Sequence, residues 1–354
     1  MKLSVIIVNY NVKYYLEQCL LSLKASIRNQ DIEILVVDNH SSDGSLEYLR
    51  PGFPDIVFIA NNENTGFSKA NNQAIRFAKG EYLLLLNPDT VIGEHTLDTL
   101  CRFMDEHADA GALGVKMIDG HGCFLPESKR GFPSPWNSLC KMTGISKIFP
   151  RSPLFGKYHL KYLDENSIHQ VDVLAGACMM LRKTALDQAG LLDESFFMYG
   201  EDIDLSYRIS QAGYHNYYVP EKIIHYKGES TKKDWRYIKI FYEAMLIFFK
   251  KHFPHHNRFY GFPIYLAIYI AGAIASIKNT LFPPVKYKSI RNTPDNNIVF
   301  NTSKKSYEEI ISTMDSLKNK KHCFWIYHPE IRTAIASNCI LTGEEIAKYD
   351  FFRE

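Results

Sequence analysis

A regular alternation of short apolar runs and helical patterns constrains the first part of this chain more than any other feature. Runs of four to six apolar residues predict strands, and the segments between them carry apolar residues at helical spacing. Strands separated by helices indicate βαβ units, and therefore a parallel sheet with helices on both faces. The predicted strands are Leu3–Val8, Glu33–Val37, Ile56–Ile59 and Tyr82–Leu86, and the predicted helices are Val12–Ala25, Ser42–Leu49, Phe67–Ala78 and Glu94–His107.

The alternation becomes looser beyond Gly111, and a proline-rich stretch, Lys129–Lys161, lies between the next elements. The chain then regains clear patterns and ends in what we expect to be a small α/β tail. The further predicted strands are Ala112–Met117, Val171–Leu181, His215–Val219, Ile298–Phe300 and Cys323–Tyr327, and the further helices are Asp202–Ala212, Tyr237–Phe253 and Ser306–Lys318.

One segment, Phe259–Ile277, has no charged residue and is flanked by Arg258 and Lys278. Its length is close to the roughly 20 residues that a helix needs to cross a bilayer. We therefore expect this segment to contact a membrane, as a span, a re-entrant segment or an interfacial helix. A buried core helix is the alternative.

Charge and cysteine usage exclude several classes of protein. The formal net charge is +2, which gives no general attraction to nucleic acid. The seven cysteines are scattered, odd in number and without a CxxC pair, which argues against a disulfide framework or a zinc site. The first eleven residues lack the cleavage site of a signal peptide, so a cytoplasmic protein is expected.

Each of the first four predicted strands ends in asparagine or aspartate. Ligands of open parallel sheets bind in the crevice beyond the carboxyl ends of the strands, where these side chains would gather. Asparagine and aspartate are also ordinary turn residues, which is the alternative for any single strand end. The strand ends are Asn9–Asn11, Asp38–Asn39, Asn61–Asn62 and Asn87–Asp89.

Asp89 is the most informative of these residues. It follows four consecutive leucines, Leu83–Leu86, which must be buried, and a carboxylate near such a strand is costly unless it is paired or bound to a metal. A hard divalent cation that also binds a diphosphate would satisfy it. The alternative is a turn residue that caps the following helix.

A second acidic cluster, Glu201–Asp204, follows a run of aromatic residues at the start of a predicted helix. Carboxylates are favoured at helix N-termini, which is the structural explanation. Asp202 and Asp204 cannot share a helix face, so at most one of them points at a substrate. Glu201 or Asp202 could serve as a general base, which must stay ionised and reach a hydroxyl. From spacing alone, His225 is more often structural than a ligand.

Seven groups of short segments in this chain resemble the motifs of family 2 inverting glycosyltransferases of the GT-A fold, especially the bacterial rhamnosyltransferase-like branch. They occur in the order of that family over about residues 3 to 230. They are Val5-Ile-Ile-Val-Asn-Tyr-Asn11, Val36-Val-Asp-Asn39 with Ser41-Ser-Asp-Gly44, Asn64-Thr-Gly-Phe67 with Ala70-Asn-Asn72, Leu86-Asn-Pro-Asp89, Gly176-Ala-Cys-Met179, Gly200-Glu-Asp-Ile-Asp204 and His225.

The resemblance implies a GT-A, Rossmann-like mixed sheet flanked by helices, and a site that binds a nucleotide-sugar donor. The metal, Mg²⁺ or Mn²⁺, would bind Asp89 and His225. Asn87 replaces the first aspartate of the family's Asp-x-Asp and would belong to the donor-binding residues. Asp202 would be the catalytic base, with Glu201 as the other candidate. The implied contacts to the nucleoside are Asn9, Tyr10, Asp38 and Asn39, and those near the diphosphate or donor sugar are Asn64, Gly66 and Asn72.

The implied reaction is an inverting transfer of a sugar to a hydroxyl in cell-surface polysaccharide synthesis. Rhamnose from dTDP-rhamnose is the first donor to test, then UDP-sugars, and the acceptor would be a glycan or a polyprenyl-diphosphate-linked glycan at the inner face of the membrane. Acceptor recognition is expected in Lys129–Lys161. The alternatives are a nucleotidyltransferase and a non-catalytic sugar- or lipid-binding scaffold.

The expected organisation has three parts. Residues 1–235 form the catalytic domain, with donor binding in 1–110 and acceptor binding and catalysis in 111–235. Residues 236–285 are an apolar helical segment that associates with the membrane. Residues 286–354 are a small α/β appendage.

Overall fold

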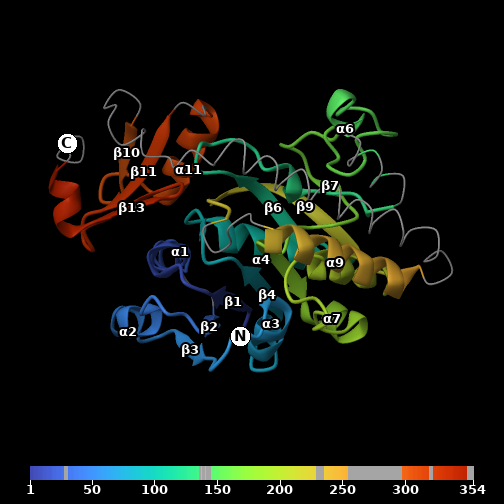
Figure 1. The fold of residues 1–354 in the computed structure, drawn as a ribbon, viewed down its shortest axis with the longest axis horizontal. Helices are drawn as coiled ribbons and strands as arrows, with labels where there is room; N and C mark the ends of the chain where they lie inside the picture. The colour runs from blue at the N-terminus through green and yellow to red at the C-terminus, as the bar shows by residue number, and fades with distance from the viewer. Residues whose placement is uncertain are drawn as a thin grey trace.

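A computed structural model of the chain describes residues 1–27, 31–134, 137, 140, 145–228, 235–253, 297–318 and 322–348 (Figure 1). Within these residues, nine strands form one mixed sheet in the order β3-β2-β1-β4-β8-β6-β9-β5, and β7 pairs with β9. The strands are β1 (Leu3–Asn9), β2 (Ile32–Asp38), β3 (Val57–Ala60), β4 (Tyr82–Leu86), β5 (Thr90–Val91), β6 (Ala110–Ile118), β7 (His169–Gln170), β8 (Cys178–Arg182) and β9 (His215–His225).

The first four predicted strands are confirmed, and they pair in parallel as the βαβ pattern indicates. β1 lies between β2 and β4, and β3 pairs with the outer edge of β2. β8 runs antiparallel to both β4 and β6, which makes the sheet mixed, as the family resemblance implies. Because Asn9 pairs with Asp38 in register, the polar ends of β1 and β2 reach the same edge of the sheet.

Helices cover both faces of the sheet, as predicted. α1 (Lys13–Ser26) and α4 (Thr96–Glu106) pack their leucines against one face, while α3 (Phe67–Ile75), α7 (Lys183–Ala189) and α8 (Glu201–Gln211) cover the other. The two layers give two buried clusters of aliphatic side chains. The shorter helices are α2 (Ser45–Leu49), η1 (Arg50–Gly52), η2 (Pro126–Ser128) and α6 (Ile145–Ile148).

The predicted strand Val171–Leu181 is wrong in its first part, because only Cys178–Arg182 is a strand of this ladder. Val173 instead exchanges backbone hydrogen bonds with Arg130, at 3.0 and 2.9 Å. Gly176 then passes beside α8, where an added Cβ would lie 3.4 Å from Asp202. Leu174 packs its side chain over Gly114 of β6 without belonging to a strand of the ladder, and an apolar run alone does not distinguish these two kinds of burial.

The α/β tail is confirmed, and it shares a core with the rest of the chain. Tyr15 of α1 donates a hydrogen bond to the carbonyl of Ala336 at 2.9 Å, and Gln18 lies 3.0 Å from His328. One buried cluster joins apolar residues of α1 and β9 to those of the tail. The tail consists of β10 (Asn297–Asn301), α11 (Tyr307–Leu317), β11 (Cys323–His328), β12 (Thr333–Ala336), β13 (Cys339–Thr342) and η6 (Gly343–Lys348).

The predicted helix Tyr237–Phe253 is present as α9 (Trp235–His252; Figure 1), and its His252 contacts Asp204 of α8. In the part of the chain that the structure describes, no helix combines the length and apolar character needed to cross a bilayer. The segment Phe259–Ile277, for which membrane contact is expected, lies outside the described residues.

Candidate active site

A cavity of about 360 Å³ opens at the carboxyl ends of the central strands, where the sequence predicts a ligand crevice. It is lined from both halves of the predicted catalytic domain, because α8 and the end of β9 face the ends of β1, β2 and β4. The sequence-predicted residues that line it are Tyr10, Asn39, Asn64, Asn87, Asp89, Glu201, Asp202 and His225.

Asn9 and Asp38 lie behind the cavity wall and do not line it. Asn9 is fully buried, and its amide donates hydrogen bonds to Asp38 at 2.7 Å and to Ser41 at 3.1 Å. The second carboxylate oxygen of Asp38 accepts the backbone N–H of Ser41 at 2.9 Å. The Asn9–Asp38 pair therefore fixes the loop after β2. At the ends of β1 and β2, Tyr10 and Asn39 are the residues that line the cavity.

Asn39 holds the loop before α3 in place. Its amide donates to Asn64 at 2.9 Å and to the carbonyl of Gly66 at 3.2 Å, and its oxygen accepts the N–H of Thr65 at 3.0 Å. Gly66 has φ +84° and a Cβ there would lie 2.7 Å from the carbonyl oxygen of Phe197, so only glycine fits. The close approach joins this loop to the one that precedes α8.

Asn72, a predicted donor-site residue, has a structural role in this state. It is buried, and its amide group exchanges hydrogen bonds with the backbone of Leu192 at 2.8 and 3.1 Å. The same amide donates to Glu194 at 3.0 Å. Asn72 therefore ties α3 to the segment that leads into the acidic cluster.

Asn87, Asp89 and His225 meet at the cavity, although His225 is far from the other two in sequence. β5 pairs antiparallel with the end of β9, and this register places Thr90 opposite His225. The Nε2 atom of His225 lies 3.3 Å from Asp89 Oδ1 and 3.4 Å from Asn87 Nδ2. Asp89 is only 3% exposed and lies beside the imidazole of His225, while its role as a metal ligand stays a prediction.

Asp202 lies at the N-terminus of α8, and its carboxylate forms an ion pair with Arg130, Nη2 to Oδ2 2.5 Å. The same carboxylate accepts the backbone N–H groups of Ile203 at 2.8 Å and Gly176 at 3.3 Å. Arg130 also donates to the carbonyl of Leu174 at 2.7 Å. These contacts hold Asp202 in one orientation at the cavity wall.

Glu201 also lines the cavity, and its side chain is buried. Burial, and secondly the negative charge of Asp202, raise the pKa of Glu201 to about 8. Its Oε2 atom makes no hydrogen bond to the described residues. At neutral pH Glu201 is therefore mostly protonated, and the adjacent carboxyl groups carry about one negative charge between them.

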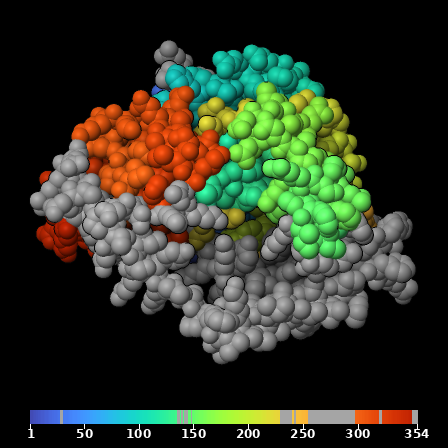
Figure 2. Space-filling model, turned by 90° about the horizontal axis from the view of Figure 1, so that it is seen from above, coloured from blue at the N-terminus to red at the C-terminus, as the bar shows by residue number. Residues whose placement is uncertain are grey.

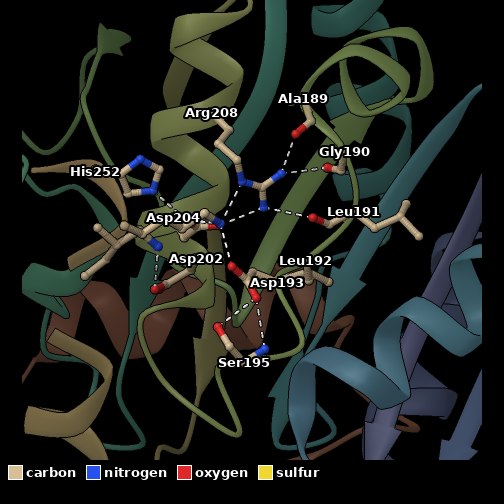
Figure 3. Close-up of polar contacts among 12 residues, drawn as sticks. Ala189, Gly190, Leu191, Leu192, Asp193, Ser195, Asp202, Asp204, Arg208 and His252 are labelled. Atoms are coloured by element: carbon tan, nitrogen blue, oxygen red, sulfur yellow. Dashed lines mark hydrogen bonds and ion pairs between the residues drawn. The ribbon is translucent and has the colours of Figure 1, made fainter. Parts of the chain in front are cut away.

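Asp204 faces away from the cavity, as the helix geometry predicts. Figure 3 shows its carboxylate directed at Arg208 and His252. The distances are 2.8 Å to Arg208 Nε and 2.6 Å to His252 Nε2, and Lys251 of α9 lies 2.9 Å away. Asp204 thus anchors the end of α9 to α8.

Sequence reasoning missed three charged residues of the cavity: Arg130, Glu127 and Lys227. Burial acts to raise the pKa of Glu127, but its ion pair with Lys227 outweighs burial and lowers that pKa. Arg130 and Lys227 lie in loops and Glu127 lies in the short helix η2. The long-range bridge between Arg130 and Val173 brings Arg130 to α8. Their local sequence contains no signal for this placement.

Comparisons with known proteins identify the family. Residues 4–190 match the model of glycosyl transferase family 2. The N-acetylglucosaminyl-diphospho-decaprenol L-rhamnosyltransferase of Mycobacterium tuberculosis is 31% identical over 66% of this chain and 78% of its own length. The rhamnosyltransferase WbbL of Escherichia coli K12 is 28% identical over 64% of this chain and 84% of its own length.

The fold also resembles that of a solved structure, GalNAc-T7 with UDP, GalNAc and Mn²⁺. The TM-score is 0.51 at 17% identity, over 69% of this chain and 47% of that one. The family match decides for a glycosyltransferase over a nucleotidyltransferase. This chain is a GT-A glycosyltransferase that belongs to glycosyl transferase family 2 and falls in its rhamnosyltransferase-like branch.

Proposed function

We propose that the protein transfers a sugar, with inversion, from a nucleotide-sugar to a hydroxyl of a lipid-linked glycan in cell-surface polysaccharide synthesis. One observation carries the proposal: Asp89 and Asp202 line the same cavity, together with the strand ends of β1, β2 and β4. Such a cavity has a place for a diphosphate and a separate carboxylate for the acceptor.

The donor set at Asp89 suits a divalent cation. It contains a buried carboxylate and an imidazole nitrogen 3.3 Å from it, and the amide nitrogen of Asn87 lies 3.4 Å from the same imidazole nitrogen. Within the described residues no three His, Cys, Asp or Glu side chains cluster as a complete metal site, so the diphosphate and water would supply the other ligands. When bound, Mg²⁺ or Mn²⁺ would offset the charge that develops on the departing nucleoside diphosphate.

Asp202 is the base in this proposal. It would accept the proton of the acceptor hydroxyl as the oxygen attacks the anomeric carbon from the face opposite the diphosphate. A single displacement of this kind inverts the anomeric centre without a covalent intermediate. Arg130 orients the carboxylate, and protonated Glu201 can donate a hydrogen bond without adding a second negative charge.

The relatives suggest which donor and acceptor to test. Two of them are named rhamnosyltransferases, and one of these is named for an N-acetylglucosaminyl-diphospho-decaprenol acceptor. dTDP-rhamnose is therefore the first donor, UDP-sugars are the second choice, and a polyprenyl-diphosphate-linked N-acetylglucosamine is the first acceptor. Tyr10 and Asn39 would contact the nucleoside, and Asn64 the diphosphate or sugar.

The test offers the full chain and Mn²⁺ a set of dTDP-, UDP- and GDP-sugars with the lipid-linked acceptor, and measures release of the nucleoside diphosphate. We expect release with one donor class, dependent on acceptor and on divalent cation. The absence of release from every donor would refute the transferase proposal. Release that persists in excess chelator would refute the metal role of Asp89 and His225 while leaving transfer itself in place.

A further inference from the structure

The segment between Glu127 and Asp164 contains basic residues but, from residue 129 to residue 163, no acidic residue. Acidic residues number 39 of 354 in the chain, yet none occurs from residue 129 to residue 163. Of its basic residues, Lys129 is buried, and Arg130 is mostly buried, with its ion pair to Asp202. The seven basic residues of the segment are Lys129, Arg130, Lys141, Lys147, Arg151, Lys157 and Lys161.

The same segment exposes large apolar side chains. Ile148 is 70% exposed, Phe149 53% and Leu154 60%, on a bright green region that projects at the surface in Figure 2. Neighbouring exposed apolar side chains of this size usually mark a contact surface. The name "148–161 patch" is used here for these three residues together with the exposed cations Arg151, Lys157 and Lys161.

The patch is fixed relative to the cavity. Lys129 Nζ donates to the carbonyls of Leu160 at 3.0 Å and Leu163 at 2.8 Å, and the N–H of Gly131 donates to Tyr158 at 3.2 Å. Tyr158 itself lines the cavity. Leu154 is four residues before Tyr158, so their Cα atoms lie within about 14 Å even for an extended chain.

We propose that the 148–161 patch docks on a bilayer that contains anionic lipids. Exposed Ile, Phe and Leu side chains can enter the boundary between headgroups and acyl chains, and the surrounding cations match anionic headgroups. The absence of acidic residues from 129 to 163 removes the repulsion that such a surface would otherwise meet. The residues of this patch are different from those of the expected membrane segment, Phe259–Ile277.

Docking of this patch on a membrane would affect how the acceptor reaches the cavity. This consequence rests on the proposed function. A polyprenyl-linked acceptor keeps its lipid in the bilayer and presents its diphosphate and sugar at the headgroup level. The patch would hold the cavity beside that level, since Tyr158 belongs both to the anchored segment and to the cavity wall. The acceptor could then enter without leaving the membrane.

The first test is hydrogen–deuterium exchange of the full chain with vesicles of phosphatidylcholine alone or with 30–40% phosphatidylglycerol, roughly the anionic content that gives a strong surface potential. We expect slower exchange in residues 145–161 with anionic vesicles, and weaker protection as salt is raised. Binding of the chain to vesicles without protection of 145–161 would overturn the proposal. Protection by a water-soluble acceptor without vesicles, or by higher protein concentration alone, would also overturn it, in favour of a glycan or a second copy.

The second test is vesicle co-sedimentation of the variant Ile148→Ser/Phe149→Ser/Leu154→Ser. We expect partition to anionic vesicles to fall about tenfold or more, because three apolar side chains no longer enter the bilayer. The matched control is Val57→Ser/Phe77→Ser, whose wild-type side chains are 50% and 63% exposed on other elements. Equal partition of the patch variant and the wild type would refute the docking surface.

Donor turnover with a water-soluble acceptor separates this proposal from the proposed function. A patch variant that loses vesicle binding but keeps this turnover supports both proposals. Vesicle-dependent protection of 145–161 in a protein that turns over no donor would sustain the docking surface and refute the transferase mechanism.

Discussion

Replacing Glu201 with glutamine is expected to remove a pH-dependent loss of stability from this protein. The folded state raises the pKa of Glu201 from 4.5 to about 8, first through burial and then through the charge of Asp202. Between these two pKa values the folded state holds a proton that the unfolded state has released. The stability linked to this proton is therefore fully present below about pH 4.5 and is lost as the pH rises through 8.

The size of the effect follows from the two pKa values. With 4.5 in the unfolded state and about 8 in the folded state, the free energy of unfolding should fall by about 3 kcal/mol between pH 5 and pH 8 from Glu201 alone. Glutamine has nearly the same shape and cannot ionise. The wild type should therefore lose this amount relative to Glu201→Gln over that range, whatever other groups titrate in both proteins.

The assay is urea unfolding of both proteins at pH 5, 6, 7 and 8, followed by circular dichroism. The measured quantity is the difference in unfolding free energy between the variant and the wild type at each pH. We expect this difference to grow in favour of the variant by about 3 kcal/mol from pH 5 to pH 8. A difference that stays constant across the range would refute the assignment of a protonated Glu201, and with it the single shared negative charge beside the cavity.

Other substitutions test separate parts of the site. Asp202→Asn should abolish transfer while nucleotide binding survives in calorimetry, and near-normal turnover would place the base elsewhere. Arg130→Met should lower the unfolding free energy by about 3 kcal/mol, because it leaves the mostly buried carboxylate unpaired. Adding Asp202→Asn should recover part of that loss, and strictly additive effects would contradict the pairing. Asp89→Ala should remove the Mn²⁺ dependence of nucleotide binding, and unchanged calorimetric titrations would refute its metal role. Gly66→Ala should destabilise the fold by about 1–3 kcal/mol, since φ is +84° and a carbonyl oxygen lies 2.7 Å from the added carbon. Gly52→Ala, with nothing within 4 Å, is its control and should have little effect.

Periodicity predicted the layered first half well because each strand there is continuous, apolar and separated by a helix. Tyr82–Leu86 has the predicted bounds, and all five residues are buried. Val171–Leu181 failed because its first residues pack on the sheet and pair with Arg130 without joining the ladder that β8 forms. Burial produces apolar sequence in both cases, so composition cannot separate them.

The candidate site was predictable to the extent that it lies at strand ends. Asp89 could be predicted as a site residue from the buried leucines that precede it. The partner of Asp89 was not derivable from spacing, because His225 reaches it through the pairing of β5 with β9 across a large sequence separation. The position of Arg130 at the cavity was even less predictable, because no local pattern distinguishes a lysine–arginine pair in a loop from an ordinary solvated surface.

The shared core of the tail limits how this enzyme can be divided. Cutting the chain after β9 would uncover Val12, Tyr15 and Ile224, which are packed against tail residues in one cluster. The buried Lys116 would also lose Asp315, its partner on α11 at 3.4 Å. The family resemblance ends near residue 230, yet the part that can fold alone extends further. The tail is therefore packed as part of the same folded unit, and its removal would expose the apolar outer surface of α1 to water.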